Sequence, residues 1–123
     1  GSTSQLSTEL LKMMTGVKMT HVPYKGAGPA LIGAVAGEID LMISGVSTGL
    51  PFIKQGKLRG LAVTSRTRVT VLPDLPPVAD TVPGYEAASW YAVMAPAATP
   101  RAVIDRLNRD SIAAIQSPEI SAK

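Results

Sequence analysis

The chain has 123 residues, 46% of them hydrophobic, so it can bury one core but is short for two independent domains. Its net charge of +3 is spread without runs of one sign, and only 4% of residues are aromatic, which argues against nucleic-acid binding. The absence of cysteine excludes disulfides and thiolate chemistry, and no apolar run approaches the roughly 20 residues of a membrane span.

An apolar stripe at helical spacing predicts a first helix, which ends at Gly16 in a left-handed cap. The stripe consists of Leu6, Leu10, Met13 and Met14. Residues 18–22 are then expected to form a short strand. A second helix follows a turn-rich segment, with Pro29 at its first position and Gly37 at its end.

The same alternation continues along the chain. Residues 39–43 have the pattern of a second strand, and Ser47 is expected to cap a third helix that runs to about Gln55. Residues 58–64 give a third strand. Strands and helices that alternate with short connections favour parallel pairing with right-handed crossovers. The sequence therefore predicts an α/β fold, a mainly parallel sheet flanked by helices.

The last third of the chain begins with a proline-rich segment, residues 65–86, which can hold at best one short turn of helix. Residues 88–95 are expected to form another strand, and Thr99 with Pro100 marks the start of a final helix. The buried stripe of that helix is expected to comprise Val103, Ile104, Leu107, Ala114 and Ile115.

Three helix starts combine small or hydroxyl residues with free backbone amides: residues 1–5, 24–28 and 44–48. In an open parallel sheet, ligands bind beyond the carboxyl ends of the strands, where such helix starts gather. This arrangement suits a carboxylate or phosphate, and the mild positive charge favours an anion. Each segment taken singly also fits an ordinary turn.

Other chemistries fit the residues poorly. A dinucleotide fingerprint fails because its third glycine would fall at Leu31. His21 is the only histidine and lies inside a strand pattern, so a packed or hydrogen-bonded role is expected in place of catalysis. Glu38 and Asp40 lie at the start of a strand, where solvation explains them best. We therefore expect no catalytic residue, no metal site and no cofactor.

The segment His21–Leu31 closely resembles the signature of the Bug, or TctC-like, tripartite tricarboxylate transporter receptors. The resemblance continues in order along nearly the whole chain. Its further parts are Gly37–Met42, Gly56–Arg59 with Leu61–Thr64, Leu72–Asp74 with Pro77–Ala79, and Trp90–Tyr91 with Ala95–Pro96 and Thr99–Pro100.

The resemblance implies a type II periplasmic-binding-protein fold, a clamshell of two lobes that hold a small carboxylate between them. Such a receptor is periplasmic, is not an enzyme and delivers its ligand to the permease subunits of a membrane transporter without entering the membrane itself. Residues 1–123 resemble one ligand-binding lobe, the second, with about 88–123 comprising the crossover strand and the return helix toward a first lobe that this chain lacks.

The family's binding positions fall on the same three helix starts. The ligand-binding residues that the resemblance implies are Thr3, Ser4 and Gln5, then Tyr24, Lys25, Gly26, Ala27 and Gly28, and finally Ser44, Gly45, Val46 and Ser47. Two positions depart from the family pattern: Gln5 replaces a frequent histidine, and Ser44 with Gly45 replaces a common Asp-Asn pair. Without that acidic group a cationic amine lacks a partner, which favours a simple mono- or dicarboxylate over an amino acid.

Two other functions remain open at this point. The chain could be the effector-binding domain of a bacterial transcription regulator, which shares a related bilobed architecture. It could also be a small hydrolase or transferase that uses His21 as its base. For the receptor, Tyr24 and Lys25 would act as supporting donors, and a single lobe would bind its ligand only weakly.

Overall fold

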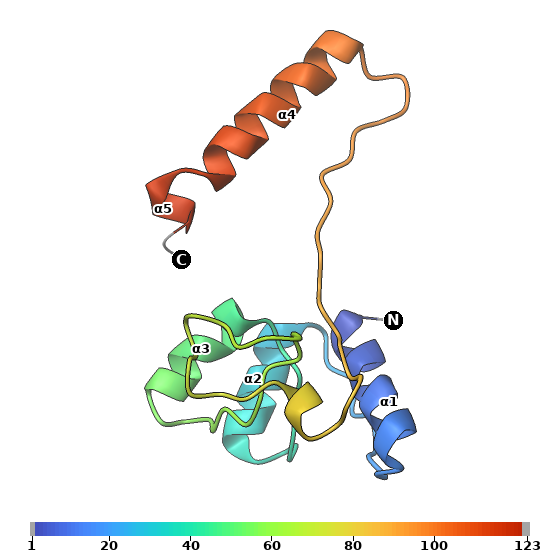
Figure 1. Ribbon diagram of the computed structural model, residues 1–123, viewed down its shortest axis with the longest axis vertical. Coiled ribbons are helices and arrows are strands. Elements are labelled where there is room, and N and C mark those ends of the chain that lie inside the picture. The colour runs from blue at the N-terminus through green and yellow to red at the C-terminus, as the bar shows by residue number, and fades with distance from the viewer. Residues whose placement is uncertain (1, 122–123) are drawn as a thin grey trace. The chain divides into compact units, whose positions relative to one another are not determined.

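The computed structural model describes residues 2–121, which form two compact units divided after Ser89. The division falls close to residue 88, where the sequence predicts the crossing segment to begin. Figure 1 shows the elements of both units. The first unit holds α1 (Thr3–Thr15), α2 (Ala27–Ala36), α3 (Val46–Lys54) and the short 3₁₀ turn η1 (Val78–Asp80), and the second holds α4 (Arg101–Ile115) and α5 (Pro118–Ser121).

Glycines end the first two helices as the sequence predicts. Gly16 has a φ of 71° and donates its backbone N–H to the Lys12 carbonyl at 2.8 Å. Gly37 has a φ of 77° and donates to the Ala34 carbonyl at 3.2 Å. A residue with a Cβ rarely adopts this left-handed conformation, so these two positions fix where α1 and α2 stop. The single short turn expected in the proline-rich segment is η1.

The predicted starts of the later helices are wrong by one or two residues. Ser47 does not cap α3, because Gly45 is already extended (φ −60°, ψ 141°) and its carbonyl accepts the N–H groups of Thr48 and Gly49. Ser47 is therefore the second residue of α3, and its hydroxyl is not at the capping position. Pro29 is the third residue of α2 instead of its first, and α4 begins after Pro100.

The described residues contain no strand ladder. Residues 18–22, 39–43, 58–64 and 88–95 carry no assigned strand between positions 2 and 121. One isolated parallel bridge joins Val63 to Pro77, with N–H···O distances of 2.9 Å from Val63 to Pro76 and from Val78 to Val63. The third predicted strand thus finds its partner in the proline-rich segment, and the parallel sheet stays a prediction.

The core of the first unit is small and brings distant segments together. Leu31 on α2 is 1% exposed, Val63 is 6% exposed, and Tyr85 is 1% exposed. The Tyr85 hydroxyl donates a hydrogen bond to the backbone carbonyl of Ser7 at 3.0 Å, and Ser7 on α1 is itself buried. Helices α2 and α3 pack against each other. The Tyr85 hydrogen bond therefore links α1 to the end of the proline-rich segment, while α2 packs on α3.

The apolar stripe predicted on the last helix is present on α4 but is not buried. Its large members are between 37% and 63% exposed, namely Val103, Ile104, Leu107 and Ile115. One long helix and the short α5 have too little apolar surface of their own to cover such a face. Among the described residues, neither α4 nor any other helix is long and apolar enough to cross a lipid bilayer.

Replacing Leu31 with alanine should destabilise the first unit by about 2–5 kcal/mol, because the change leaves a cavity at a fully buried site. Ile32→Ala is the matched control, since Ile32, the next residue on α2, is 68% exposed. Its replacement should change the free energy of unfolding by less than about 0.5 kcal/mol. Urea denaturation of both variants measures the difference. Equal losses would mean that α2 does not bury the Leu31 face.

Candidate functional site

Helices α1, α2 and α3 begin on the same side of the first unit (Figure 1). The first N–H groups of a helix have no partner within the helix, so they are donors available to a ligand. Within residues 2–121, no hydrogen bond occupies the first two backbone N–H groups of α1 or of α2 and α3. These donors belong to Thr3 and Ser4, Ala27 and Gly28, and Val46 and Ser47.

The three helix starts differ in how they are capped. At α1, the Ser2 hydroxyl accepts the N–H of Gln5 at 3.3 Å, which occupies one donor of that turn. At α2 and α3 the N-cap residues are Gly26 and Gly45, neither of which has a side chain that could cap the helix. A side-chain cap normally satisfies one of these amides. Its absence leaves the starts of α2 and α3 open to an external acceptor.

A cavity of about 940 Å³ connects two of the three helix starts. Ser4 and Gln5 on α1 line it together with Tyr24, Gly26 and Ala27 at the start of α2. It continues between α1 and the extended segments 18–23 and 38–43. Five of the twelve predicted binding residues therefore share one cavity.

The other seven predicted residues lie outside the lining of this cavity. Thr3, Lys25 and Gly28 belong to the first two helix starts and are exposed. The third start, residues 44–47, adjoins the cavity only through Ile43. There the Ser44 side chain lies over α3, since a Cβ added to Gly49 would sit 3.1 Å from the Ser44 Oγ. The proposed roles of all twelve residues stay predictions.

The Tyr24 side chain turns away from the start of α2 and lies along the helix. Its hydroxyl donates to Glu38 Oε2 at 3.1 Å, and its ring rests on Gly33, where an added Cβ would come within 2.8 Å of the Tyr24 Cζ. Partial burial raises the pKa of the Tyr24 phenol, and the hydrogen bond and the charge of Glu38 raise it further. Tyr24 could donate to a ligand only by giving up this bond.

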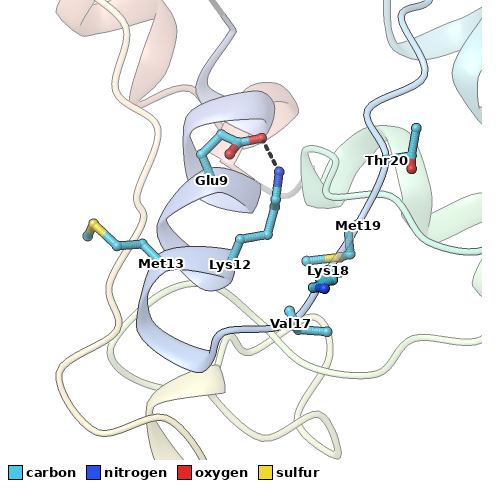
Figure 2. A pocket seen from close by; sticks show the side chains of 7 residues that line it. All are labelled: Glu9, Lys12, Met13, Val17, Lys18, Met19 and Thr20. Carbon is cyan, nitrogen blue, oxygen red and sulfur yellow. Dashed lines mark hydrogen bonds and ion pairs between the residues drawn. The ribbon is translucent and has the colours of Figure 1, made fainter.

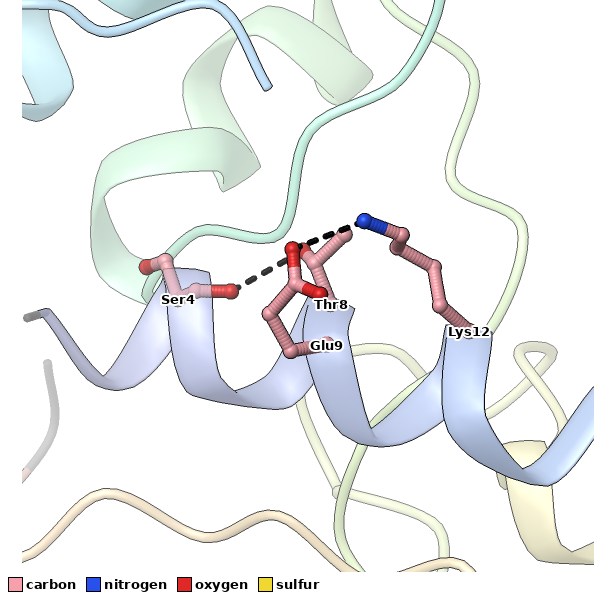
Figure 3. A network of polar contacts seen from close by, with 4 residues as sticks. All are labelled: Ser4, Thr8, Glu9 and Lys12. Carbon is pink, nitrogen blue, oxygen red and sulfur yellow. Dashed lines mark hydrogen bonds and ion pairs between the residues drawn. The ribbon is translucent and has the colours of Figure 1, made fainter. Parts of the chain in front are cut away.

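The wall of the cavity that α1 contributes is polar. Figure 3 shows Ser4, Thr8, Glu9 and Lys12 along this face of the helix. The Thr8 hydroxyl donates to the Ser4 carbonyl at 3.0 Å, and Lys12 forms an ion pair with Glu9 at 2.9 Å. These bonds are local to α1, so they fix the side chains without closing the cavity.

A second, shallower pocket of about 550 Å³ lies at the other end of α1. Figure 2 shows Lys12 and Glu9 on the helix facing the extended residues 17–20. The Lys12 ammonium is already paired with the Glu9 carboxylate there. The pocket shares five of its seven lining residues with the larger cavity, Lys12 and Lys18 among them, so the two hollows adjoin one another.

His21 lies on the wall of the larger cavity and is exposed, which differs from the packed role expected for it. No hydrogen bond joins it to a carboxylate or hydroxyl within the described residues. Those residues also contain no cluster of three metal-ligating side chains. The geometry thus gives His21 no partners of the kind that a catalytic base needs.

Sequence reasoning missed three contacts that shape the site. The Ser2 cap on α1, the bond between Tyr24 and Glu38, and the contact of Tyr85 with Ser7 were not expected. Glu38 was assigned to solvation, whereas it accepts the Tyr24 hydroxyl. A serine before a helical pattern is a recognisable cap signal, but the other two contacts join positions 14 and 78 residues apart.

The profile of the tripartite tricarboxylate transporter family receptors matches residues 1–123. The chain belongs to this family. It is 38% identical over 122 residues to a UPF0065 protein in the tcbD-tcbE intergenic region of Pseudomonas sp. strain P51, covering 98% of the chain and 36% of that protein. It is also 38% identical to BugT of Bordetella pertussis, over 98% of the chain and 37% of BugT. The chain thus spans little more than a third of these two relatives.

Solved structures give the same family and the fold. The chain matches R. palustris Rpa4515, determined with adipate, with a TM-score of 0.94 and 43% identity, over 99% of the chain and 41% of that protein. It matches the periplasmic binding protein BugD with a TM-score of 0.89 and 33% identity, over 97% and 40%. MatC from Rhodopseudomonas palustris, with bound malate, matches at 0.89 and 30%, over 97% and 41%. The fold is therefore that of the periplasmic binding proteins.

Replacing Glu38 with glutamine should lower the pKa of Tyr24 part of the way toward its ordinary value, because the negative charge is lost while the partial burial remains. In the wild type, the pKa of Tyr24 is higher in the folded state than its value near 10.0 in the unfolded state. The neutral phenol therefore contributes its full stabilisation below pH 10, and this contribution is lost as the pH rises through the folded pKa. Ultraviolet titration of tyrosinate, with Tyr24→Phe for subtraction, measures the shift. Asp40→Asn is the control and should leave the Tyr24 titration unchanged.

Proposed function

We propose that this chain is a ligand-binding lobe of an extracytoplasmic receptor that captures a small carboxylate for a tripartite tricarboxylate-type transporter. The observation that carries the proposal is that three helices begin on one side of the unit with unoccupied N–H groups. Helix starts attract anions through these donors and through the helix dipole. The receptor carries out no chemistry on its ligand.

The nature of the ligand follows from the donors and from the relatives. Backbone amides with nearby hydroxyls suit one carboxylate group, which accepts several hydrogen bonds at once. Rpa4515 with adipate and MatC with malate are two relatives of the same fold that hold dicarboxylates. The Ser44–Gly45 pair brings no acidic partner for an amine to the third helix start. A mono- or dicarboxylate without an amino group is therefore the best candidate.

The proposal extends to the whole receptor. We place the ligand between this lobe and a first lobe that relatives of greater length contain, with residues 88–123 as the crossing strand and return helix. The predicted parallel sheet would form from residues 18–22, 39–43 and 58–64. The receptor would work in the periplasm, like the periplasmic binding protein BugD, and pass its ligand to the permease subunits.

Calorimetric titration tests the proposed function on two forms of the protein. The full-length receptor should bind adipate or malate and should not bind adipamide, which has the length of adipate without its charges. The 123-residue chain alone should bind only at millimolar concentration or more weakly, because closure of the first lobe over this one excludes water and strengthens each hydrogen bond. A full-length receptor that binds no carboxylate contradicts the function, and equal micromolar binding by both forms contradicts the two-lobed site.

Proline at the first helical position removes one backbone donor while it preserves the helix. At α3, Val46→Pro is compatible with the extended conformation of Gly45 and should weaken carboxylate binding roughly tenfold to a hundredfold if its N–H bonds the anion. Val46→Ala retains the N–H and is the matched control. Thr3→Pro and Ala27→Pro test the other two helix starts in the same way.

Circular dichroism should show that each proline variant keeps its helix content. Unchanged affinity in all three proline variants, with the helices intact, would exclude the helix starts as the anion site. A loss confined to one variant would identify which start holds the carboxylate.

A further inference from the structure

Tyr85 is as deeply buried as any large side chain in the first unit, and its hydroxyl forms a hydrogen bond. The hydroxyl donates to the Ser7 carbonyl on α1 at 3.0 Å, across 78 positions of sequence. Ser7 in turn donates its own hydroxyl to the carbonyl of Thr3 at 2.7 Å. The bond from Tyr85 therefore reaches α1 one turn away from its unoccupied first N–H groups.

The two residues that follow Tyr85 are also tied down. The Glu86 carboxylate accepts two hydrogen bonds from Arg66, at 3.1 Å from Nε and 2.8 Å from Nη2. The Ala87 N–H donates to the Thr64 carbonyl at 3.0 Å. Three successive residues are thus bound to two parts of the first unit, α1 and residues 64–66.

Directly after these anchors the chain is unsupported. Between residues 88 and 95 the described structure contains no backbone hydrogen bond, and the first unit ends at Ser89. The side chains of Trp90 and Tyr91 are 81% and 97% exposed. Residues 85–87 therefore form the fixed end from which the crossing segment departs.

We infer that Tyr85 is a positioning residue, which holds the first turn of α1 in place for ligand binding and ties that turn to the fixed end of the crossing segment. The inference rests on the proposed function for its ligand. Its geometric part stands on the bonds of Tyr85, Glu86 and Ala87 alone. Because the Tyr85 side chain joins α1 to the start of the crossing segment, increased motion of either one should increase the motion of the other.

Hydrogen–deuterium exchange on the full-length receptor tests the inference with Tyr85→Phe, which keeps the buried ring and removes the hydroxyl. Amides in the first turns of α1 and at residues 85–87 should exchange about three to ten times faster, as expected for one lost hydrogen bond. The Kd for adipate should rise by a similar factor. Tyr91→Phe makes the same change on an exposed tyrosine and should alter neither measurement.

The outcomes separate the inference from the proposed function. If the wild-type receptor binds no carboxylate, the proposed function fails, yet the exchange pattern still decides whether Tyr85 couples α1 to the crossing segment. Wild-type exchange rates at α1 in Tyr85→Phe would overturn the coupling. So would faster exchange spread evenly over α1, α2 and α3, because that pattern indicates a general loss of stability.

A second variant keeps the test decisive if Tyr85→Phe folds poorly. Glu86→Gln weakens the neighbouring anchor to Arg66 and should speed exchange at residues 86–89 while the first turns of α1 remain protected. Equal loss of protection at α1 in Glu86→Gln would show that Tyr85 has no special role. Faster exchange with an unchanged Kd in Tyr85→Phe would overturn the positioning role in binding.

Discussion

The hydrogen bond from Tyr85 to the Ser7 carbonyl is the interaction on which the first unit depends most. It joins the beginning of the unit to its end, whereas the Tyr24–Glu38 and Arg66–Glu86 bonds span 14 and 20 positions. A buried tyrosine needs a partner for its hydroxyl, so the bond and the burial of the ring support each other. The placement of α1, and with it one of three candidate anion-binding turns, follows from this contact.

The helix starts of the candidate site have few side-chain caps. Most helix starts satisfy their first amides with a serine, threonine or aspartate cap. Here α2 and α3 begin after Gly26 and Gly45, which have no side chain to offer, and α1 uses Ser2 for one donor only. Exposed N–H groups at a helix start bond to water when no side chain caps them. Under the proposed function, an anion would replace that water at the starts of α2 and α3.

The helices were largely predictable from the sequence because their signals are local. Gly16 and Gly37 end α1 and α2 as expected, since the left-handed cap depends on one residue. The Ser47 cap was wrong because the extended backbone at Gly45 started α3 earlier. The expected burial on α4 was wrong for another reason: periodicity identifies an apolar face but does not show what covers it. The sheet depends on pairing between distant segments and stays a prediction.

The candidate site was placed from the sequence as segments and not as side chains, and its role in binding stays a prediction. Five of the twelve predicted residues line one cavity, because helix starts are visible in sequence. The direction of Tyr24 was not visible, since it is set by Gly33 and Glu38, which lie beyond the turn that contains it. The family resemblance named the right protein family, yet it carried no information on which donors are already occupied.

The stretch from residue 88 to 95 has a consequence for the isolated chain in solution. Its backbone groups have no partner among the described residues, and Trp90, Tyr91, Val93 and Met94 are all more than four-fifths exposed. Extended backbone with aromatic and β-branched side chains is a template for pairing with another molecule. On its own, the 123-residue chain therefore carries an aggregation-prone segment. Its tendency to self-associate in solution is expected to depend on residues 88–95, which lie outside the candidate site.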